Sequence, residues 1–375
     1  MNISVMQENL ARGLSTVSRA VSSRATLPVL ANVLLRTEDS GLKLTATNLE
    51  IGINCWVPGK VNAEGAITVP AKLFTDLVAS LPNQRIDLEL STKDRTLRLT
   101  CGGSRASIKG IDADEFPVVS AIGDAPATTV PARALREALN EVVFAADSDE
   151  SRPILTGVLT KLAGDKMTLA AADNYRIAVR TLTTLSPVTE DLSIVVPARS
   201  YAELSRIMPD SDDPIEITVT PNKSQILFHV EGIDLVSRLI EGQFPNYEPI
   251  IPASHSSRAI VDREAFLSGA RRASIFARDS ANIVKIALGA EDGEGPVKIT
   301  AHAADVGDND DAIEGSLEGS PTTIAFNARY LIEVLSNLGA DEAALELSGP
   351  LAPGVIRGVG KDDYVHVIMP VRTAS

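Results

Sequence analysis

The sequence predicts an α+β protein in which one unit of about 125 residues is repeated three times in tandem. Three observations support this: each third opens with an amphipathic helix, a second helix starts about 65 residues later, and alternating strands follow both. The length of 375 residues also exceeds what a single core supports. We place the domains at residues 1–124, 125–253 and 254–375, with turn-forming residues at both boundaries.

The first helix of each third carries apolar residues at i, i+4 and i+7, which lie on one helical face. A strand pair rich in β-branched residues follows each of these helices. The helix positions are Leu10, Leu14 and Val17, then Leu135, Leu139 and Val142, then Phe266, Ala270 and Ala273. The expected strand segments are 27–30 with 42–45, 153–155 with 167–170, and 284–287 with 297–300.

The second helices share a start, at Pro70-Ala71-Lys72, Pro197-Ala198-Arg199 and Asn327-Ala328-Arg329. Proline is favoured near a helix start. Their buried faces match at i, i+3, i+4 and i+7. Those faces are Phe74, Leu77, Val78 and Leu81, then Tyr201, Leu204, Ser205 and Met208, then Leu331, Val334, Leu335 and Leu338. We therefore expect six related helices, two per domain, packed on antiparallel sheets.

The composition is that of a soluble protein, with 44% apolar and 22% charged residues and no apolar stretch near the roughly 18 residues of a membrane span. The first residues show no secretory signal, so we expect a cytoplasmic protein without membrane contact. Two cysteines, Cys55 and Cys101, form no framework and are interpreted as reduced and structural.

No catalytic motif is found. The histidines His229, His255, His302 and His366 are isolated, and no phosphate loop, dinucleotide fingerprint or serine nucleophile motif occurs. The segment 305–311 is acidic but lacks the residue order of a calcium loop. We interpret it as a solvated, interaction-prone loop, and we expect no cofactor, no metal and no enzymatic activity.

The net charge of −14 argues against ordinary binding to nucleic acid. The predicted helical segments, however, contain thirteen basic and nine acidic residues. Their net charge is therefore about +4, and that of the rest of the chain is about −18. Arg12 and Arg19 lie on one face, roughly opposite Leu10 and Leu14. A surface lined by such helices would suit weak, sequence-independent phosphate contact. For any single arginine, an ordinary solvated helix face remains an equal alternative.

A repeated unit without catalytic residues suggests a scaffold whose shape is its function. A domain of this size has a radius of gyration near 14 Å and a diameter of about 35 Å. Six such domains in a ring, as in a head-to-tail dimer, leave a hole on the order of 30 Å, wider than a DNA duplex of roughly 20 Å.

Four segments together resemble the bacterial sliding clamp family, the β subunits of the replicative DNA polymerase III. They are Arg24-Ala25-Thr26-Leu27-Pro28-Val29-Leu30, Asp173-Asn174-Tyr175-Arg176, Phe326-Asn327-Ala328-Arg329-Tyr330-Leu331 and Val367-Ile368-Met369-Pro370-Val371-Arg372. The resemblance implies a homodimeric six-domain ring around double-stranded DNA. It also implies loading by an ATP-driven clamp loader, and a role as a processivity factor for replicative and repair polymerases.

The resemblance further implies a groove for short Gln-Leu-type peptides between the second and third domains. The matching positions are Arg152, Leu155, Ala172, Tyr175, Arg176, Ile177, Pro245, Ile250, Asn327, Tyr330, Val367, Ile368, Met369, Pro370, Val371 and Arg372. The sequence departs from the enteric pattern at Ala172, at Tyr175 and in its last three residues, so the peptide preference is expected to differ.

For DNA, Arg24 is the best match to the family, and Asp149 replaces an amide so that its contact is not carried over. The helical DNA candidates are Arg12, Arg19, Arg136, Arg199, Arg271 and Arg272. For the dimer interface, we expect a basic strand of one subunit to face an acidic segment of the other. The expected interface residues are Arg95, Arg98 and Arg105 opposite Asp305, Asp308, Asp310, Asp311 and Glu314.

Two alternatives stay open from the sequence. One is a peptide-binding scaffold of clamp ancestry that no longer serves the main polymerase. The other is an enzyme of a type that the motifs above do not reveal.

Overall fold

The computed structural model describes residues 1–22, 27–38, 41–120, 126–188, 190–278, 280–289, 297–305 and 307–372. The chain forms two compact units, which we call unit 1 (residues 1–132 and 206–239) and unit 2 (residues 133–205 and 240–375). The division passes through the predicted central domain. Part of that domain therefore shares a sheet with the first repeat, and the rest shares a sheet with the third.

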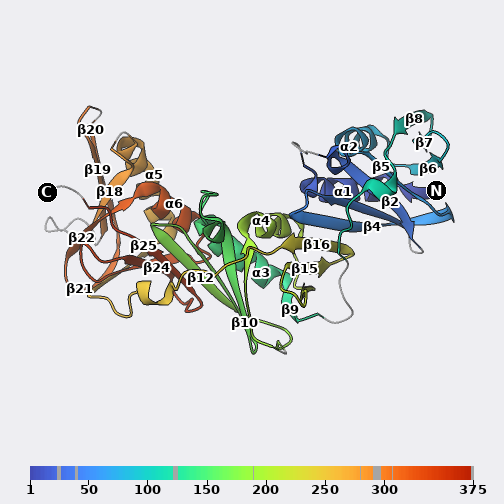
Figure 1. The fold of residues 1–375 in the computed structure, drawn as a ribbon. Helices are drawn as coiled ribbons and strands as arrows, with labels where there is room; N and C mark the ends of the chain where they lie inside the picture. The colour runs from blue at the N-terminus through green and yellow to red at the C-terminus, as the bar shows by residue number, and fades with distance from the viewer. Residues whose placement is uncertain are drawn as a thin grey trace. The chain divides into compact units, whose positions relative to one another are not determined.

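Within the described residues, unit 1 contains two α-helices, the nine strands before residue 132 and three later strands (Figure 1). In chain order its elements are β1 (Asn2–Met6), α1 (Gln7–Val17), η1 (Ser18–Ala20), η2 (Pro28–Ala31), β2 (Asn32–Glu38), β3 (Gly41–Thr47), β4 (Ile51–Ala63), β5 (Ala66–Pro70), α2 (Ala71–Ser80), β6 (Arg85–Ser91), β7 (Thr96–Cys101), β8 (Ser104–Lys109), η3 (Ala113–Glu115), β9 (Thr128–Pro131), β14 (Pro214–Val219), β15 (Gln225–Val230) and β16 (Ile233–Arg238).

The sheet of unit 1 is antiparallel and follows the order β8-β7-β6-β1-β4-β16-β15-β14-β9, with β3, β2 and β5 branching from β4. The long strand β4 makes this possible. Its first residues pair with β16, from Ile51 opposite Ser237 to Cys55 opposite Ile233, and its last residues pair with β1. Strand pairing thus joins the first repeat to the second.

Unit 2 contains the remaining four helices (Figure 1). Its elements are α3 (Ala132–Val142), η4 (Val143–Ala145), η5 (Pro153–Thr156), β10 (Gly157–Ala163), β11 (Lys166–Ala172), β12 (Arg176–Thr183), β13 (Leu192–Pro197), α4 (Ala198–Ile207), η6 (Glu248–Ile250), β17 (Ser257–Asp262), α5 (Arg263–Ala277), β18 (Ile283–Leu288), β19 (Val297–Ala303), β20 (Gly307–Ile313), β21 (Gly315–Gly319), β22 (Thr322–Asn327), α6 (Ala328–Asn337), β23 (Glu342–Leu347), β24 (Gly354–Gly358) and β25 (Tyr364–Ile368). The first residue of α3 and the last two of α4 are assigned to unit 1.

A nine-stranded antiparallel sheet organises unit 2, in the order β13-β10-β11-β12-β25-β24-β23-β17-β21. Its centre is the pairing of β12 with β25, from Arg176 opposite Ile368 to Arg180 opposite Tyr364. This pairing joins the second repeat to the last strand of the third. A separate four-stranded sheet has the order β20-β19-β18-β22.

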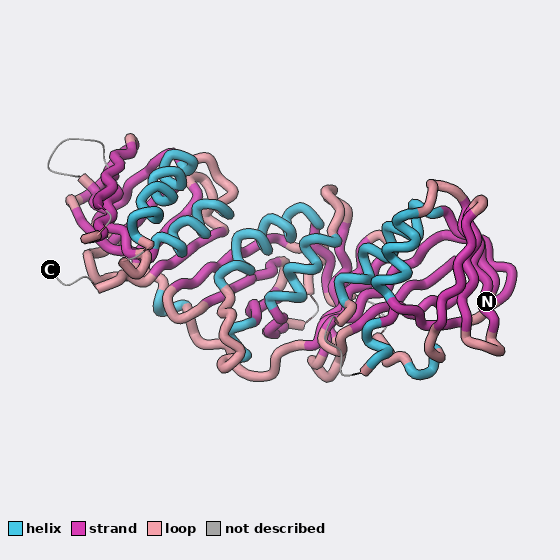
Figure 2. Tube along the Cα trace, turned by 90° about the horizontal axis from the view of Figure 1, so that it is seen from above, coloured by secondary structure: helices cyan, strands magenta, loops and turns pink. Residues whose placement is uncertain are grey.

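Six α-helices lie in the described part of the chain, as the repeat predicts, and Figure 2 shows them in pairs beside the strands. The predicted apolar faces of α1, α3 and α5 are fully buried. In the second helices, Phe74, Tyr201 and Leu331 are buried, whereas Leu77 and Leu81 are only partly covered. Sequence periodicity therefore identifies the helices and most of their core contacts.

Three sequence predictions were wrong. Segments 27–30 and 153–155 are not strands, because Pro28 and Pro153 begin the 3₁₀ turns η2 and η5 that precede β2 and β10. The fixed φ of proline suits the first position of such a turn. The acidic segment from residue 307 is not a loop: it forms β20, whose backbone pairs with β19 from Gly307 to Ile313. Charged residues on an edge strand oppose uncontrolled sheet pairing.

A buried ionic network ties α3 to the end of unit 2. The carboxylate of Glu141 is 2% exposed and lies 3.0 Å from Nε of Arg180. It also accepts the backbone N–H of Gly339 at 3.2 Å and lies 3.7 Å from Nζ of Lys361. Arg180 contacts Asp363 as well. Since a buried charge is costly without partners, this network favours one relative placement of α3, β12 and the segment before β25.

We predict that Leu14→Ala destabilises unit 1. Leu14 is fully buried where α1 packs on β3 and β4. The truncation leaves a cavity worth about 2–5 kcal/mol. Trp56 on β4 is the one tryptophan of the chain, so its fluorescence follows the unfolding of unit 1 in urea. The midpoint falls for Leu14→Ala and stays unchanged for Leu185→Ala, which truncates a leucine of unit 2 that is 58% exposed. Equal midpoints would contradict this core.

We also predict that His366 makes the fold sensitive to mild acid. Its ring is fully buried and stacks on Phe144 with centroids 5.5 Å apart. Burial, and then the charge of Arg176, lower the pKa of His366 from 6.5 to about 3. Between these two pH values His366 is protonated in the unfolded chain but not in the folded chain. The free energy of unfolding therefore falls as the pH drops below 6.5.

His366→Phe keeps an aromatic ring beside Phe144 and removes this titration. Relative to wild type, the variant should lose about 2 kcal/mol less stability between pH 7.5 and pH 5.0. The measurement is urea denaturation at both pH values, followed by circular dichroism. Val118→Ala, at a residue that is 98% exposed and does not titrate, serves as the control and should match wild type. An identical pH dependence in His366→Phe would contradict the assignment.

Candidate functional site

An apolar cluster on one face of the unit 2 sheet is the first candidate site. Its buried members come from η5, β10, β11, β12, β13, β24, β25 and the chain segment between β16 and β17. They are Leu155, Leu159, Ala170, Ala172, Ile177, Val195, Phe244, Tyr247, Val355 and Val367. Four of them form one lateral row across neighbouring strands, because Ala172 pairs with Ile177, Ile177 with Val367, and Val367 with Val355.

Large apolar side chains remain exposed beside this cluster. Tyr175 is 55% exposed, Ile250 42% and Met369 37%. The backbone N–H of Met369 donates to the carbonyl of Tyr175 at 2.7 Å, which holds these two residues together just beyond the paired ends of β12 and β25. Ile250 precedes Ile251, which packs on the cluster. A buried apolar floor with an exposed apolar rim is suited to an apolar side chain of a ligand.

Arg176 fixes the polar side of the site. Its guanidinium, 8% exposed, donates from Nε to Asp173 at 3.0 Å and from Nη2 to the carbonyl of Phe144 at 2.7 Å, and it also bonds Glu333 of α6. Asp173 in turn accepts the backbone N–H groups of Tyr175 and Arg176 at 2.7 and 3.0 Å. One side chain therefore connects the turn before β12 with η4 and α6.

Two tyrosines stack on each other beside this arginine, and only Tyr330 lies against its guanidinium. The rings of Tyr175 and Tyr330 have centroids 6.1 Å apart, and the Arg176 guanidinium lies 4.7 Å from the Tyr330 centroid. Burial, followed by the charge of Asp173, raises the pKa of Tyr330 above its usual value. The phenol therefore stays neutral at physiological pH. Arg152 extends the polar side: it bonds Asn174 and lies 3.3 Å from Asp147.

The structure brings the predicted groove residues together in unit 2 but gives them different roles. Ile368 is fully buried and lies on the opposite face from Val367, so its side chain belongs to the core. Asn327 caps α6 by accepting the N–H of Arg329 at 2.9 Å. Exposed members are Tyr175, Pro245, Ile250, Met369 and Arg372; partly buried ones are Arg152, Tyr330, Pro370 and Val371; buried ones are Leu155, Ala172, Arg176, Ile177 and Val367.

Sequence reasoning missed six residues that build this site. Asp173 stands in a segment already singled out, and its spacing to Arg176 is the one local signal. The other five carry none, because they reach the site through pairing and packing between distant segments. The six are Asp173, Phe144, Glu333, Phe244, Tyr247 and Val355.

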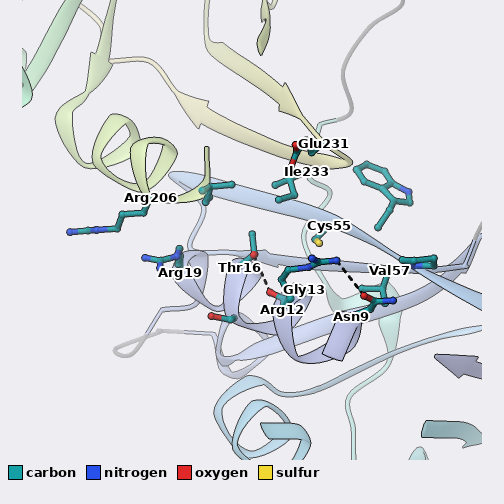
Figure 3. Close-up of a pocket in the computed structure, with 14 residues that line it drawn as sticks. Asn9, Arg12, Gly13, Thr16, Arg19, Cys55, Val57, Arg206, Glu231 and Ile233 are labelled. Carbon is teal, nitrogen blue, oxygen red and sulfur yellow. Dashed lines mark hydrogen bonds between the residues drawn. The ribbon is translucent and has the colours of Figure 1, made fainter. Parts of the chain in front are cut away.

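A second candidate surface lies in unit 1, where α1 faces β4 and β16 around a cavity of about 440 Å³. Figure 3 shows Arg12 and Arg19 with Arg206 on its rim and Cys55 at its base. All three arginines are exposed. Burial raises the pKa of Cys55 to about 11, although the charge of Arg12 opposes the rise. The thiol is therefore neutral, and the cavity presents positive charge.

The other helical DNA candidates are distributed over unit 2, with Arg136 on α3, Arg199 on α4, and Arg271 and Arg272 on α5. Arg272 bonds Asp311 of β20, with an Nη2 to Oδ1 distance of 2.7 Å, so its charge is partly neutralised within the chain. Arg271 lies 3.5 Å from the hydroxyl of Ser336. Arg24 lies outside the described residues.

Four of the eight predicted dimer residues lie on edge strands of two sheets. Arg105 is on β8, the edge of the unit 1 sheet, with Arg98 on the neighbouring β7. Asp308, Asp310 and Asp311 are on β20, the edge of the four-stranded sheet.

Several of these charges already have partners in the same chain. Arg95 lies 3.7 Å from Asp112 and 3.9 Å from Glu115, and Asp310 lies 3.1 Å from Lys298. Asp308 contacts His302. Arg98, Arg105, Asp305 and Glu314 are exposed. The charge available for contact with a second chain is therefore smaller than the sequence suggests.

No group of three potential metal ligands occurs among the described residues. In the same part of the chain, no helix has the length and apolar character needed to cross a membrane.

Comparisons with known proteins agree over the whole chain. Family models of the DNA polymerase III beta subunit match in tandem: the N-terminal domain at residues 1–120, the central domain at 129–246 and the C-terminal domain at 248–372. The beta sliding clamp of Synechococcus elongatus is 34% identical and that of Bacillus subtilis 29%, each over 100% of both chains.

Solved structures give the same result. The DNA polymerase sliding clamp of Bacillus subtilis superposes with a TM-score of 0.94 at 29% identity, covering 100% of both chains. The beta subunit from the DNA polymerase of Streptococcus pyogenes gives 0.93 at 26%, also over 100% of both chains. With three clamp domains in tandem along its length, the chain belongs to the DNA polymerase III beta subunit family, the beta sliding clamps.

Proposed function

We propose that this chain forms a homodimeric ring around duplex DNA and confers processivity on the replicative polymerase in the cytoplasm. The observation that carries this proposal is the tandem match of three clamp domains over nearly the full chain. We assign the domains to residues 1–124, 125–253 and 254–375. The chain contributes binding surfaces and no catalytic step.

Contact with DNA would come from the helices. Arg12, Arg19 and Arg206 surround one cavity of unit 1, and Arg136, Arg199 and Arg271 lie on helices of unit 2. Guanidinium groups of this kind bind phosphate without reading bases. Such contact allows movement along the duplex, while the net charge of −14 disfavours tight binding of nucleic acid elsewhere on the surface.

Dimerisation would join the β8 edge of one subunit to the β20 edge of the other. Among the described residues, β8 and β20 each have a strand neighbour on one side only. Their outer backbone N–H and C=O groups can therefore pair with a strand of another subunit. The ion pairs within the chain leave few charges for this contact, so apolar side chains must supply most of its stability. Leu73 on α2 and Ile275 on α5 are 55% and 64% exposed, and we assign them this role.

The unit 2 cluster would receive the apolar residues of partner peptides from the clamp loader and from replicative and repair polymerases. Support comes from its buried floor, its exposed rim and the ordered polar group around Arg176. Because Arg176 is nearly buried, we assign it to positioning Tyr175 and Tyr330 as well as to peptide contact.

We predict that the chain, once loaded by the clamp loader of its own organism, stays on a nicked circular plasmid during gel filtration and leaves within minutes after a restriction enzyme cuts the circle. A ring held by topology has this property because a free end lets it slide off. Ile275→Asp should lower the dimer fraction and the retention on the circle. Equal retention on circular and linear DNA would contradict encirclement.

We also predict that Met369→Ala weakens the binding of a fluorescent Gln-Leu-type peptide by about tenfold or more, as expected for a residue at an apolar hot spot. The melting temperature should change little, because Met369 is 37% exposed. The matched control is Leu351→Ala, at an exposed residue of unit 2 outside the cluster. Unchanged peptide affinity in Met369→Ala would contradict the placement of the groove.

A further inference from the structure

A small charged cavity adjoins the apolar cluster of unit 2. It has a volume of about 210 Å³ and lies between the segment 252–255 and strands β23 and β24. Its polar lining comes from Ser254, His255, Glu346, Ser348 and Arg357, and its apolar lining includes Val355. Val355 also belongs to the apolar cluster, so one side chain is shared by both. We call this cavity the charged end.

Strand register places the charged end on the same row as the groove. The row runs Ile177, Val367, Val355, Glu346 and Arg258 on five adjacent strands, each residue directly opposite the next. Directly paired residues share one face of an antiparallel sheet. The row therefore changes from buried apolar side chains to partly exposed charged ones at a fixed position, three strand intervals from Ile177.

Inside the charged end, two arginines contact one carboxylate; a second carboxylate, Glu318 of β21, is directly opposite Arg258 in the row and is exposed. Glu346, 13% exposed, accepts from Nε of Arg258 at 3.3 Å and from Nε of Arg357 at 3.3 Å, while Nδ1 of His255 lies 3.9 Å away. Two guanidinium groups thus share the carboxylate of Glu346. The carboxylate also holds both arginines in place, which lowers the entropy cost of using them to bind an anion.

The arginines keep donors for a ligand. A guanidinium has five N–H donors. Arg357 uses Nε for Glu346 and Nη1 for the carbonyl of Tyr364 at 3.4 Å, and Arg258 uses Nε. Their side chains are 30% and 26% exposed, so solvent and ligand can reach them. A carboxylate is the planar acceptor that such donors fit best.

We propose that the charged end binds an acidic side chain of the same partner peptide whose apolar residue occupies the cluster. This inference rests on the proposed peptide groove. Three strand intervals of about 4.8 Å separate Ile177 from Glu346, or roughly 14 Å, and an extended chain covers about 3.3 Å per residue. The acidic residue should therefore lie about four residues from the apolar anchor.

The test is fluorescence anisotropy with a series of labelled Gln-Leu-type peptides. A single glutamate is moved from two to eight residues from the anchor, on either side, and each peptide is compared with its glutamine twin. We expect glutamate near four residues, on one side, to tighten binding about three- to tenfold. At the other positions it should weaken binding or have no effect, because the chain carries a net charge of −14.

Chain variants identify the groups that respond. The gain from glutamate should disappear in Arg357→Gln, shrink in Arg258→Gln and partly return in Arg357→Lys. It should persist in Arg36→Gln, a control that removes one exposed arginine from unit 1. Melting curves check that each variant is folded, and the glutamine peptides should bind all of them equally well.

Two results would overturn the charged end alone: a glutamate effect that is the same at every spacing, or a gain that survives in both Arg357→Gln and Arg258→Gln. If no peptide binds the wild-type chain, including the glutamine twins, the proposal of the peptide groove is wrong. The proposal of the charged end, which depends on that groove, is then wrong as well.

Discussion

Antiparallel pairing between strands from different repeats is the constraint on which the rest of the structure depends. β4 of the first repeat pairs with β16 of the second, and β12 of the second pairs with β25 of the third. Each compact unit is therefore made from more than one repeat. The pairing of Ile177 with Val367 creates the apolar row, so the groove exists only where the second and third repeats share one sheet.

Buried ion pairs add to this strand pairing by joining β12 to two helices. Arg176 and Arg180 are four residues apart on β12, so their side chains lie on the same face of the sheet. Arg176 contacts Glu333 of α6, and Arg180 contacts Glu141 of α3. Burying these ions costs free energy, and removing one partner costs more because the other charge is then unpaired. Their contribution is thus to favour a single arrangement of helices and sheet. That arrangement holds Tyr330 beside Tyr175 at the rim of the groove.

Local patterns predicted a large part of the fold. The repeat, the six helices and the buried faces headed by Leu10, Leu135 and Phe266 follow from a 3.6-residue period and are confirmed. Sequence reasoning failed where a non-local contact or a special residue decides. Proline turns replaced the expected strands at 28 and 153, and β20 is a strand because β19 pairs with it despite its aspartates.

The candidate groove was found from the family resemblance, since no local pattern marks it. Its members Leu155, Ile177 and Val367 do cluster in the structure. Ile368, which follows Val367 directly, has its side chain on the opposite face of the sheet. Alternation along a strand decides between these neighbours, and the sequence alone does not say which face lies inside. The charged end could not be predicted from the sequence, because Arg258, Glu346 and Arg357 come into contact only through the register of three strands.

The most direct test of this account is a crystal structure of the chain with a Gln-Leu-type peptide taken from a polymerase of the same organism. We predict that an apolar side chain of the peptide contacts the cluster around Leu155, Ile177 and Val367, with the peptide bounded by Tyr175 and Met369. A peptide bound instead to the helical surface or to the unit 1 sheet, with this cluster unoccupied, would contradict it.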